Sequence, residues 1–410
     1  MSAVPGPVSS SVPGPVSAAG GSGKPLEGVR ILDLSWIGVG CIATWLLADL
    51  GAEVIKVEPP DGSDNLRTLA PHVRGVGINH LVFDRHKRSL AVNLRTEEGR
   101  EAYRAVAKTA DAVIEGMRTG VADRLGIGYP ALSELNPALT YVTLPGYGAG
   151  GPLSAVAGHD LNFDALAGVL SMTYPGPIGP PPVQAGDYFG ATLAALAVVS
   201  GILRGRSTGQ GGMIESSLFD GAMFAMAIPH ARALATGEDV VPDRYVLVGE
   251  FACYSVYECA DGGHLAVGAL EPHFWKRFCE LAGIDDGGHQ YTPGKQDGLR
   301  ATVGAVLRTR TRDEWVAHFG TEDVCVSPVL SVAEAVRGEH FTARGGVATV
   351  RHPDGGTAEV PAAPLKVGKA VDVAELPAVG QGTRELLRDA GMTTERIDEL
   401  AATGNVKADP

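Results

Sequence analysis

Over its first half, the chain alternates between short apolar runs and longer stretches with helical patterning. Short apolar, β-branched runs predict buried strands, because strands covered on both faces show no polar alternation. The expected strands lie at 28–34, 53–57, 90–92, 112–114, 141–144 and 213–215. Helical patterning predicts helices at 42–50, 97–109, 187–203 and 217–234. Alternating strands and helices predict an α/β fold with a mainly parallel, Rossmann-like sheet.

The pattern changes near residue 252. Polar and apolar residues alternate at 253–259 and 264–268, on either side of a turn rich in glycine, which is typical of an antiparallel hairpin. A helix is expected after Glu271, because proline at position 272 suits a first helical turn. These features predict a small α+β domain. We expect a disordered tail at 1–24, a large domain at 25–225 and 335–410, and a linker with the small domain at 226–334.

Composition narrows the class of protein. The 410 residues are 45% hydrophobic, enough for two domains, and the formal net charge of −13 argues against nucleic-acid and membrane partners. The five cysteines contain no CxxC pair, which favours free thiols in a reducing cytoplasm and argues against a metal site. Outside the tail, the sequence predicts no transmembrane helix.

Two motifs suggest anion binding without specifying the ligand. Gly38, Gly40 and Ala43 follow the first strand in a Gly-x-Gly-x-x-Ala pattern, and Glu58 comes 20 positions after Gly38. This weakly resembles a dinucleotide fingerprint, so a nicotinamide-dependent oxidoreductase is one hypothesis. The basic run at 85–88 is either a solvated face or a phosphate site.

Two polar elements precede apolar helical runs. His159 lies in Gly158-His159-Asp160, and Asp187 follows Gly186. Each is expected near a helix N-terminus, where Asp187 would serve either as the cap of a helix starting near residue 190 or as a catalytic group. The local sequence leaves both interpretations open.

Eight segments, in order along the chain, resemble the family III CoA-transferases and, among them, the α-methylacyl-CoA racemases most closely. The resemblance covers roughly residues 25–366. The segments that carry it are PLEGVRILDLS, LGAEVIKVEPP, FDRHKRSLAVNL, ADAVIEGMRTGVADRLGIGY, AGHDLNF, GDYFGAT, YECADGGHLAVGALEPHFW and DVCVSPVL.

This resemblance implies an interlocked homodimer, in which each subunit has a large α/β domain and a small one. The active site would lie between the large domain of one subunit and the small domain of the other. Coenzyme A, carried by the acyl-CoA substrate, would bind the first βαβ unit, and no other cofactor is implied.

The resemblance also assigns residues. His159 matches the catalytic base, Asp187 the second acid/base group, and Glu271 the partner of the histidine. Candidate coenzyme contacts from the resemblance are Arg85, Lys87 and Arg124. Ile37 and Glu58 are added only by their positions, at the first turn and at the end of the second strand. The chain departs from the family at Asp84, where asparagine is usual, and at Pro59, where arginine is common.

Racemisation of a 2-methylacyl thioester requires two acid/base groups on either side of the α carbon, and His159 and Asp187 are of suitable types. We expect the backbone N–H of Asp187 to stabilise the enolate oxygen, and Gly186 and Gly190 to let the thioester approach. In the main alternative, a CoA-transferase, Asp187 would be a nucleophile. A non-catalytic acyl-CoA binder is a third hypothesis, and it would need no acid/base set.

Overall fold

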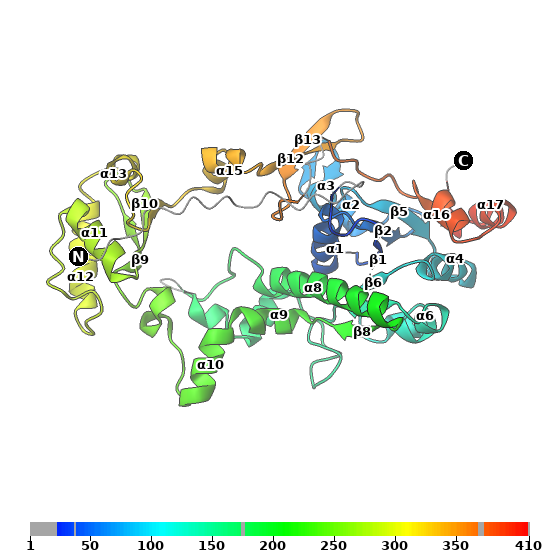
Figure 1. The fold of residues 1–410 in the computed structure, drawn as a ribbon, viewed down its shortest axis with the longest axis horizontal. Helices are drawn as coiled ribbons and strands as arrows, with labels where there is room; N and C mark the ends of the chain where they lie inside the picture. Colours follow the sequence, from blue (N-terminus) through cyan, green and yellow to red (C-terminus); the bar gives the residue numbers. More distant parts are fainter. Residues whose placement is uncertain (1–22, 37, 174–176, 368–372, 409–410) are drawn as a thin grey trace, which may run out of the picture. The chain divides into compact units, whose positions relative to one another are not determined.

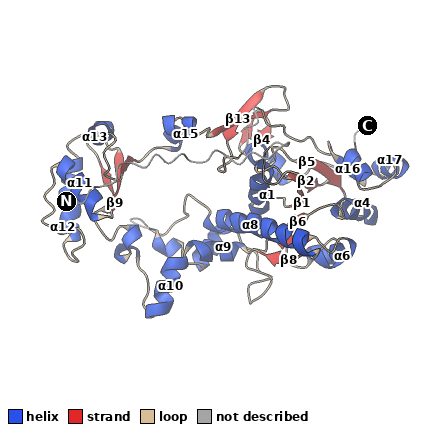
Figure 2. Cartoon of the chain, viewed as in Figure 1, coloured by secondary structure: helices blue, strands red, loops and turns tan. Residues whose placement is uncertain are grey.

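The computed structural model describes residues 23–36, 38–173, 177–367 and 373–408. The described chain divides into two compact units (Figures 1 and 2). Unit 1 comprises the described parts of Met1–Phe163, Gln184–Phe224 and Ala343–Pro410. Unit 2 comprises the described parts of Asp164–Val183 and Ala225–Thr342.

Unit 1 is built on a seven-stranded sheet in the order β14-β5-β2-β1-β6-β7-β8. All neighbouring strands are parallel except β14, which pairs antiparallel with β5. The chain proceeds outward from central β1 in one direction and then crosses to the other side at β6, which is the doubly wound order. This confirms the predicted α/β fold. The strands are β1 (Arg30–Leu34), β2 (Glu53–Glu58), β5 (Arg88–Val92), β6 (Ala112–Glu115), β7 (Thr140–Thr143), β8 (Gly212–Glu215) and β14 (Val406–Lys407).

Helices cover both faces of this sheet. The side chains of β1 alternate, so that Ile31 enters one core while Leu32 and Leu34 enter the other. The Ile31 face is covered by α1 (Val39–Asp49) and α8 (Ala185–Thr208). The opposite face is covered by α4 (Glu97–Ala107), α6 (Tyr129–Leu135), α16 (Thr383–Asp389) and α17 (Thr394–Ala402). The C-terminal helices therefore complete the core of unit 1.

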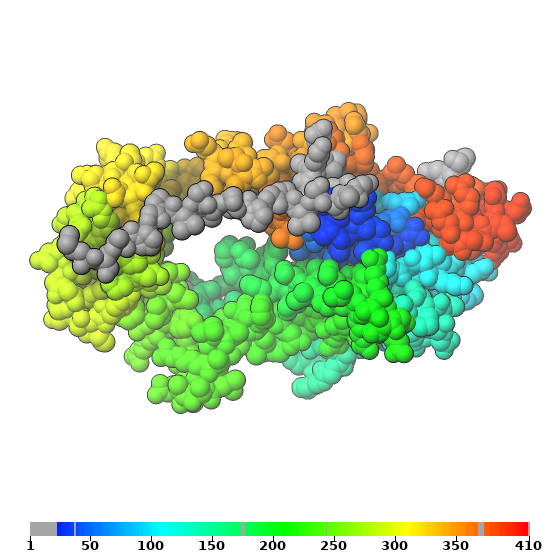
Figure 3. All heavy atoms as spheres, in the orientation of Figure 1, coloured from blue at the N-terminus to red at the C-terminus, as the bar shows by residue number. Residues whose placement is uncertain are grey.

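Helix α8 begins at Ala185, two residues before the expected span of 187–203, so Asp187 lies in its first turn and does not cap a helix that starts near residue 190. A Cβ on Gly201 would lie 2.3 Å from Cγ2 of Thr140, which explains why glycine is needed where α8 crosses β7. By length and composition alone, α8 is also the one helix among the described residues that is long and apolar enough to span a membrane. It packs beside α1 on the unit 1 sheet. In Figure 3, green residues of the chain lie against blue residues near the start of the described chain.

Smaller elements complete unit 1. The β12–β13 hairpin packs on the residues around α3 through buried Val350 and Val360. The remaining elements of unit 1 are α2 (Asn65–Thr68), β3 (His72–Val73), β4 (Val76–Gly77), α3 (Ile78–Phe83), α5 (Val121–Arg124), α9 (Leu218–Ala225), β12 (Val347–Arg351) and β13 (Thr357–Pro361). Helix α15 (Glu339–Ala343) belongs to unit 2 except for its last residue.

Unit 2 contains the predicted hairpin, β9 (Tyr254–Glu258) and β10 (His264–Gly268), extended by β11 (Val326–Pro328). Its core contains Trp275, Phe278, Trp315 and Phe319. The single helix expected at 217–234 is instead two helices, because the backbone of Met226 interrupts it. The helices of unit 2 are α10 (Ala227–Thr236), α11 (Pro272–Ala282), α12 (Gln296–Leu307), α13 (Arg312–Phe319) and α14 (Val332–Ala335), with short 3-10 turns at Leu170–Met172, Pro242–Arg244 and Val246–Val248. Helix α7 (Asp160–Leu166) begins in unit 1 and ends in unit 2.

Candidate functional site

A cleft lies at the carboxyl ends of four adjacent strands of unit 1. It consists of two neighbouring cavities of about 350 and 750 Å³. Both are lined by Trp36, after β1, and by Leu94 and Arg95, after β5. The larger cavity also reaches the residues after β6, at the point where the strand order reverses. Open parallel sheets bind their ligands at this position. We refer to these two cavities together as the strand-end cleft.

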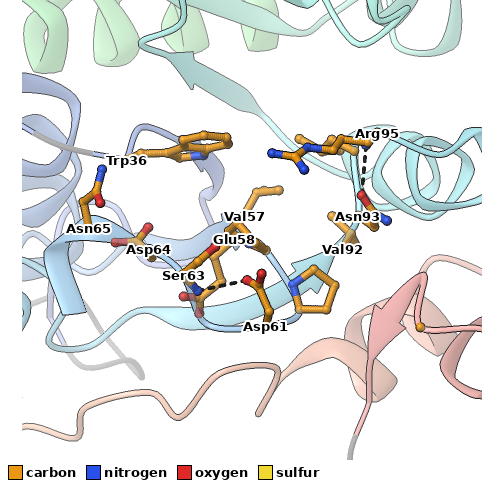
Figure 4. Close-up of a pocket in the computed structure, with 14 residues that line it drawn as sticks. Trp36, Val57, Glu58, Asp61, Ser63, Asp64, Asn65, Val92, Asn93 and Arg95 are labelled. Atoms are coloured by element: carbon orange, nitrogen blue, oxygen red, sulfur yellow. Dashed lines mark hydrogen bonds between the residues drawn. The ribbon is translucent and has the colours of Figure 1, made fainter. Parts of the chain in front are cut away.

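The strand-end cleft combines an aromatic surface with two cations and three carboxylates, Glu58, Asp61 and Asp64. Trp36 is 45% exposed, and Figure 4 shows its indole and the Arg95 side chain extending toward each other along one side of the cavity. Arg118 lines the larger cavity. Among the described residues, neither arginine forms an ion pair through its guanidinium. An exposed indole and two available guanidiniums suit a ligand with a base and phosphates.

The carboxylate of Glu58 lines the smaller cavity but already has partners. Arg67 donates to both of its oxygens, at 2.7 Å each, and the Ser89 hydroxyl donates to Oε1. A carboxylate held in this way is poorly placed to accept hydrogen bonds from a ribose. The incomplete dinucleotide fingerprint therefore ends in a structural ion pair, which removes the main support for the nicotinamide hypothesis.

Lys87 is buried beneath the sheet edge and does not line the strand-end cleft. Its Nζ lies 2.8 Å from Asp33 Oδ2 and 3.1 Å from Asp84 Oδ1, and all three side chains are fully buried. Burial favours the neutral amine, but the two carboxylates outweigh it and raise the pKa of Lys87. Asp84 also pairs with Lys56, at 3.2 Å, so this aspartate forms ion pairs with two buried cations, Lys56 and Lys87.

The other coenzyme candidates are placed differently from one another. Arg85 is buried, donates to Asp49 Oδ2 at 2.8 Å and lies over the Trp45 ring, away from the strand-end cleft. Arg124 is exposed on α5, where its neighbours Val121 and Leu125 line the larger cavity. Ile37 lies outside the described residues.

His159 and Asp187 lie at the starts of two helices that one carboxylate connects. His159 is exposed and directly precedes α7, and its carbonyl accepts from the N–H of Asn162 at 2.8 Å. Asp160, which is 8% exposed, accepts the backbone N–H of Asp187 at 3.0 Å. Through this contact, Asp160 brings the two predicted acid/base residues to adjoining helix starts.

These helix starts lie on the same edge of the sheet as the strand-end cleft. Phe163 of α7 packs edge to face on Tyr147, four residues beyond β7, with ring centroids 4.8 Å apart. The start of α8 approaches the segment after β8, where a Cβ on Gly186 would lie 2.9 Å from the carbonyl oxygen of Leu218. Both acid/base candidates come after β7 in the chain and lie near the segments that follow β7 and β8, while the cleft lies after β5, β2, β1 and β6.

One expectation about the backbone near Asp187 was wrong. Its N–H already donates to Asp160, so it is not available to a thioester oxygen. The glycines at 186 and 190 face α9 and the residues before it, because a Cβ on Gly190 would lie 3.2 Å from Cδ2 of Leu218. Glycine at these two positions permits close helix packing.

Glu271 belongs to unit 2. It is exposed and directly precedes α11, whose first helical residue is Pro272 as predicted. Its backbone carbonyl accepts from the N–H of Trp275 at 3.1 Å. The helix start therefore positions Glu271, and its pairing with His159 stays a prediction.

Sequence reasoning missed four residues at this edge: Trp36, Arg95, Arg118 and Asp160. The first three come two to four residues after an expected strand. Polar or aromatic residues just beyond parallel strands were a usable signal, because the carboxyl ends of such strands meet at one edge. Asp160 could only be recognised from its contact with α8.

A doubly wound sheet with a cleft at the carboxyl ends of its strands, and with two acid/base candidates on the same edge, is typical of an α/β enzyme. The model of CoA-transferase family III matches residues 26–383, and the chain belongs to this family.

Relatives with known activities fall into two groups. Alpha-methylacyl-CoA racemase of Mus musculus is 31% identical over 392 residues, covering 94% of this chain and 98% of the relative. Succinyl-CoA:glutarate CoA-transferase of Homo sapiens is 29% identical over 398 residues, covering 93% and 90%. Identity alone therefore does not separate racemase from transferase.

Among solved structures, a CAIB/BAIF family protein from Brucella suis matches with a TM-score of 0.74 and 27% identity, covering 90% of this chain and 100% of the other. A hypothetical protein from Mycobacterium tuberculosis matches with a TM-score of 0.75 and 27% identity, covering 88% and 99%. Both matches include residues of unit 1 and of unit 2.

Proposed function

We propose that this family III enzyme is a racemase that interconverts the (2R) and (2S) forms of 2-methylacyl-CoA thioesters. The observation that carries the proposal is the Asp160 contact, which holds His159 and Asp187 at adjoining helix starts. A transferase needs the aspartate as nucleophile, whereas proton exchange at one carbon needs two acid/base groups. The similarity to racemases over nearly the whole chain is consistent with this proposal.

The strand-end cleft would bind the coenzyme A part of the substrate. The Trp36 indole would stack on the adenine, while Arg95 and Arg118 would bind phosphate oxygens. We assign the phosphates to these arginines because Arg85 and Lys87 are buried in ion pairs. The proposed reaction uses no cofactor beyond the coenzyme A of the substrate.

At the acid/base pair, one group removes the α proton and the other returns a proton to the opposite face. His159 is exposed, so its imidazole is accessible to a thioester. Asp187 lies in the first turn of α8, where the helix N-terminus stabilises its carboxylate. The C–H bond that breaks gives an enolate, and the C–H bond that forms restores the thioester, so no electrons enter or leave the substrate.

Glu271 would complete the site from the partner subunit of an interlocked homodimer. A carboxylate beside His159 would favour the imidazolium and fix which ring nitrogen carries the proton. The exposed apolar residues of α8 support a subunit interface, since Leu196 is 62% and Leu203 71% exposed. The free thiols of the chain fit a cytoplasmic location, which we also propose.

Mixed dimers test the shared site. His159→Ala chains and Glu271→Gln chains are co-refolded and assayed for racemisation. If the pair forms across subunits, each mixed dimer has one intact site and about half of the wild-type activity, so a random mixture, about half of which is mixed dimer, recovers about a quarter. If no activity returns, or if light scattering shows an active monomer, the cross-subunit arrangement is refuted.

The alternative function is a CoA-transferase that uses Asp187 as nucleophile, which the similarity to succinyl-CoA:glutarate CoA-transferase favours. His159→Ala and Asp187→Ala separate the two functions. Loss of a general acid or base costs roughly 10²-fold or more, so both variants should lose racemisation. If His159→Ala retains near-normal turnover and the protein transfers CoA to a free acid, the transferase function replaces the racemase.

A further inference from the structure

A second cavity lies at the opposite edge of the unit 1 sheet, and neither coenzyme binding nor the acid/base pair uses it. Its volume is about 460 Å³. Lys24 precedes β1, and Arg85 and His86 precede β5, so these lining residues mark the amino ends of strands whose carboxyl ends form the strand-end cleft. The remaining wall comes from 343–349 and from 362–367 with Ala374. We refer to it as the amino-edge pocket.

The charge of the amino-edge pocket is opposite to that of the whole protein. Lys24, Arg85, Arg344 and Lys366 line it, together with His86, and Asp49 is the one acid among the lining residues. The chain as a whole carries a formal net charge of −13. Four permanent cations around one carboxylate create a local positive potential, and such a potential attracts anions.

The lining cations differ in whether a carboxylate already neutralises their charge. Arg85 is buried and forms an ion pair with Asp49 at 2.8 Å, so the charges of these two lining residues cancel. Lys366 Nζ donates to the carbonyl oxygen of Gly345 at 2.7 Å, which leaves its charge uncompensated. Among the residues that the structure describes, no carboxylate pairs with Arg344 or Lys366. Both are exposed and available to a ligand.

The rest of the amino-edge pocket is apolar. Val347, Leu365 and Val367 line it, together with the alanines at 343, 348, 362, 363 and 374. A purely inorganic anion would leave these surfaces in contact with water. A ligand with an anionic head and an aliphatic body would bury them and pair with the cations at the same time.

We propose that the amino-edge pocket binds an amphipathic organic anion, a carboxylate on a short aliphatic chain, separately from the coenzyme. Arg344 and Lys366 would bind the carboxylate, and the residues around Val347 and Leu365 would contact the chain. The proposal does not depend on whether the enzyme is a racemase or a transferase, because no acid/base residue takes part.

Octanoate is a suitable probe, and titration calorimetry on the full-length protein is the measurement. The titration is run with saturating coenzyme A, so that the strand-end cleft is filled. We expect octanoate to bind under these conditions and pyrophosphate to bind more weakly. Arg344→Gln and Lys366→Gln should each weaken octanoate binding about tenfold or more, the loss expected for one charge-assisted hydrogen bond.

Two controls make the result specific. Arg337→Gln removes one exposed cation outside the pocket and should leave octanoate affinity unchanged. Arg118→Ala should weaken coenzyme A binding without affecting octanoate. Because Arg344 and Lys366 are exposed, thermal unfolding of their variants should match the wild type.

Three outcomes would overturn the proposal. The first is octanoate affinity that is unchanged in both pocket variants. The second is complete displacement of octanoate by coenzyme A, which would place the probe in the strand-end cleft. The third is pyrophosphate binding that equals or exceeds octanoate binding, which would refute the amphipathic class of ligand.

Discussion

Asp160→Ala tests the contact that joins the two proposed acid/base residues. The Asp160 carboxylate is 8% exposed and accepts the Asp187 N–H at 3.0 Å. Removing it leaves a partly buried amide without this acceptor, which costs about 1–3 kcal/mol of folding free energy. That is a substantial share of the roughly 5–15 kcal/mol that typically stabilises a domain.

The effect on catalysis should exceed the effect on stability. Without the contact, the starts of α7 and α8 separate, and a displacement of about 1 Å in an active site costs up to about 10²-fold in rate. We expect kcat for racemisation to fall by about tenfold to 10²-fold, with little change in KM, because the strand-end cleft is elsewhere on the sheet edge. Asp160 is a positioning residue in this account.

Discontinuous assays, quenched at fixed times and followed by chiral separation of the product acids, measure kcat and KM. Urea unfolding measures stability. Asp160→Asn is the matched control, because its amide oxygen still accepts the Asp187 N–H and should recover most of kcat. If Asp160→Ala keeps the wild-type kcat, whatever its stability, the coupling of the two helix starts is refuted. An equal loss in both variants would show that the charge of Asp160 matters and the hydrogen bond does not.

Three further predictions concern unit 1. Arg118→Ala should weaken coenzyme A binding about tenfold and make it less sensitive to salt in calorimetry, and unchanged affinity would contradict our phosphate assignment. Lys87→Met leaves Asp33 and Asp84 buried without this cation and should cost about 3–5 kcal/mol in urea unfolding, whereas a neutral effect would show that the network relaxes. Burial raises the pKa of Glu115 from 4.5 to about 7. The stability from its protonated form is therefore complete below pH 4.5 and is lost as the pH rises through about 7. Glu115→Gln should remove up to about 3 kcal/mol of this decline in the free energy of unfolding. Urea unfolding at about pH 5 and about pH 8 measures the decline, and identical midpoints for variant and wild type at both pH values would contradict the prediction.

Local patterning was sufficient for the six parallel strands of the sheet, but not for the short antiparallel strand β14 or for the exact starts of helices. Buried strands such as β1 and β2 have continuous apolar runs, so their positions follow from hydrophobicity alone. The start of α8 at Ala185 has no side-chain cap. Asp187 resembled a cap in the sequence, whereas in the structure its backbone amide is held by Asp160, 27 residues earlier.

The basic run at 85–88 shows why site residues could not all be predicted. Lys87 pairs with Asp33 across 54 residues, and Arg85 pairs with Asp49 across 36. Nothing next to these residues in the sequence distinguishes a cation that binds phosphate from one that binds a distant carboxylate. Only the tertiary structure distinguishes the two kinds of cation, because it buries Lys87 and places Arg95 and Arg118 in the strand-end cleft.

The most direct test of the account is incubation of the wild-type enzyme with (2R)-2-methylacyl-CoA in deuterated water, followed by mass spectrometry and chiral analysis. Removal and return of the α proton should place one deuterium at C2 and bring the (2R) and (2S) forms to equal amounts. A parallel reaction with a free carboxylic acid should form no new thioester. Retention of the α proton and of the (2R) configuration, together with transfer of coenzyme A to the free acid, would contradict the racemase and establish a transferase.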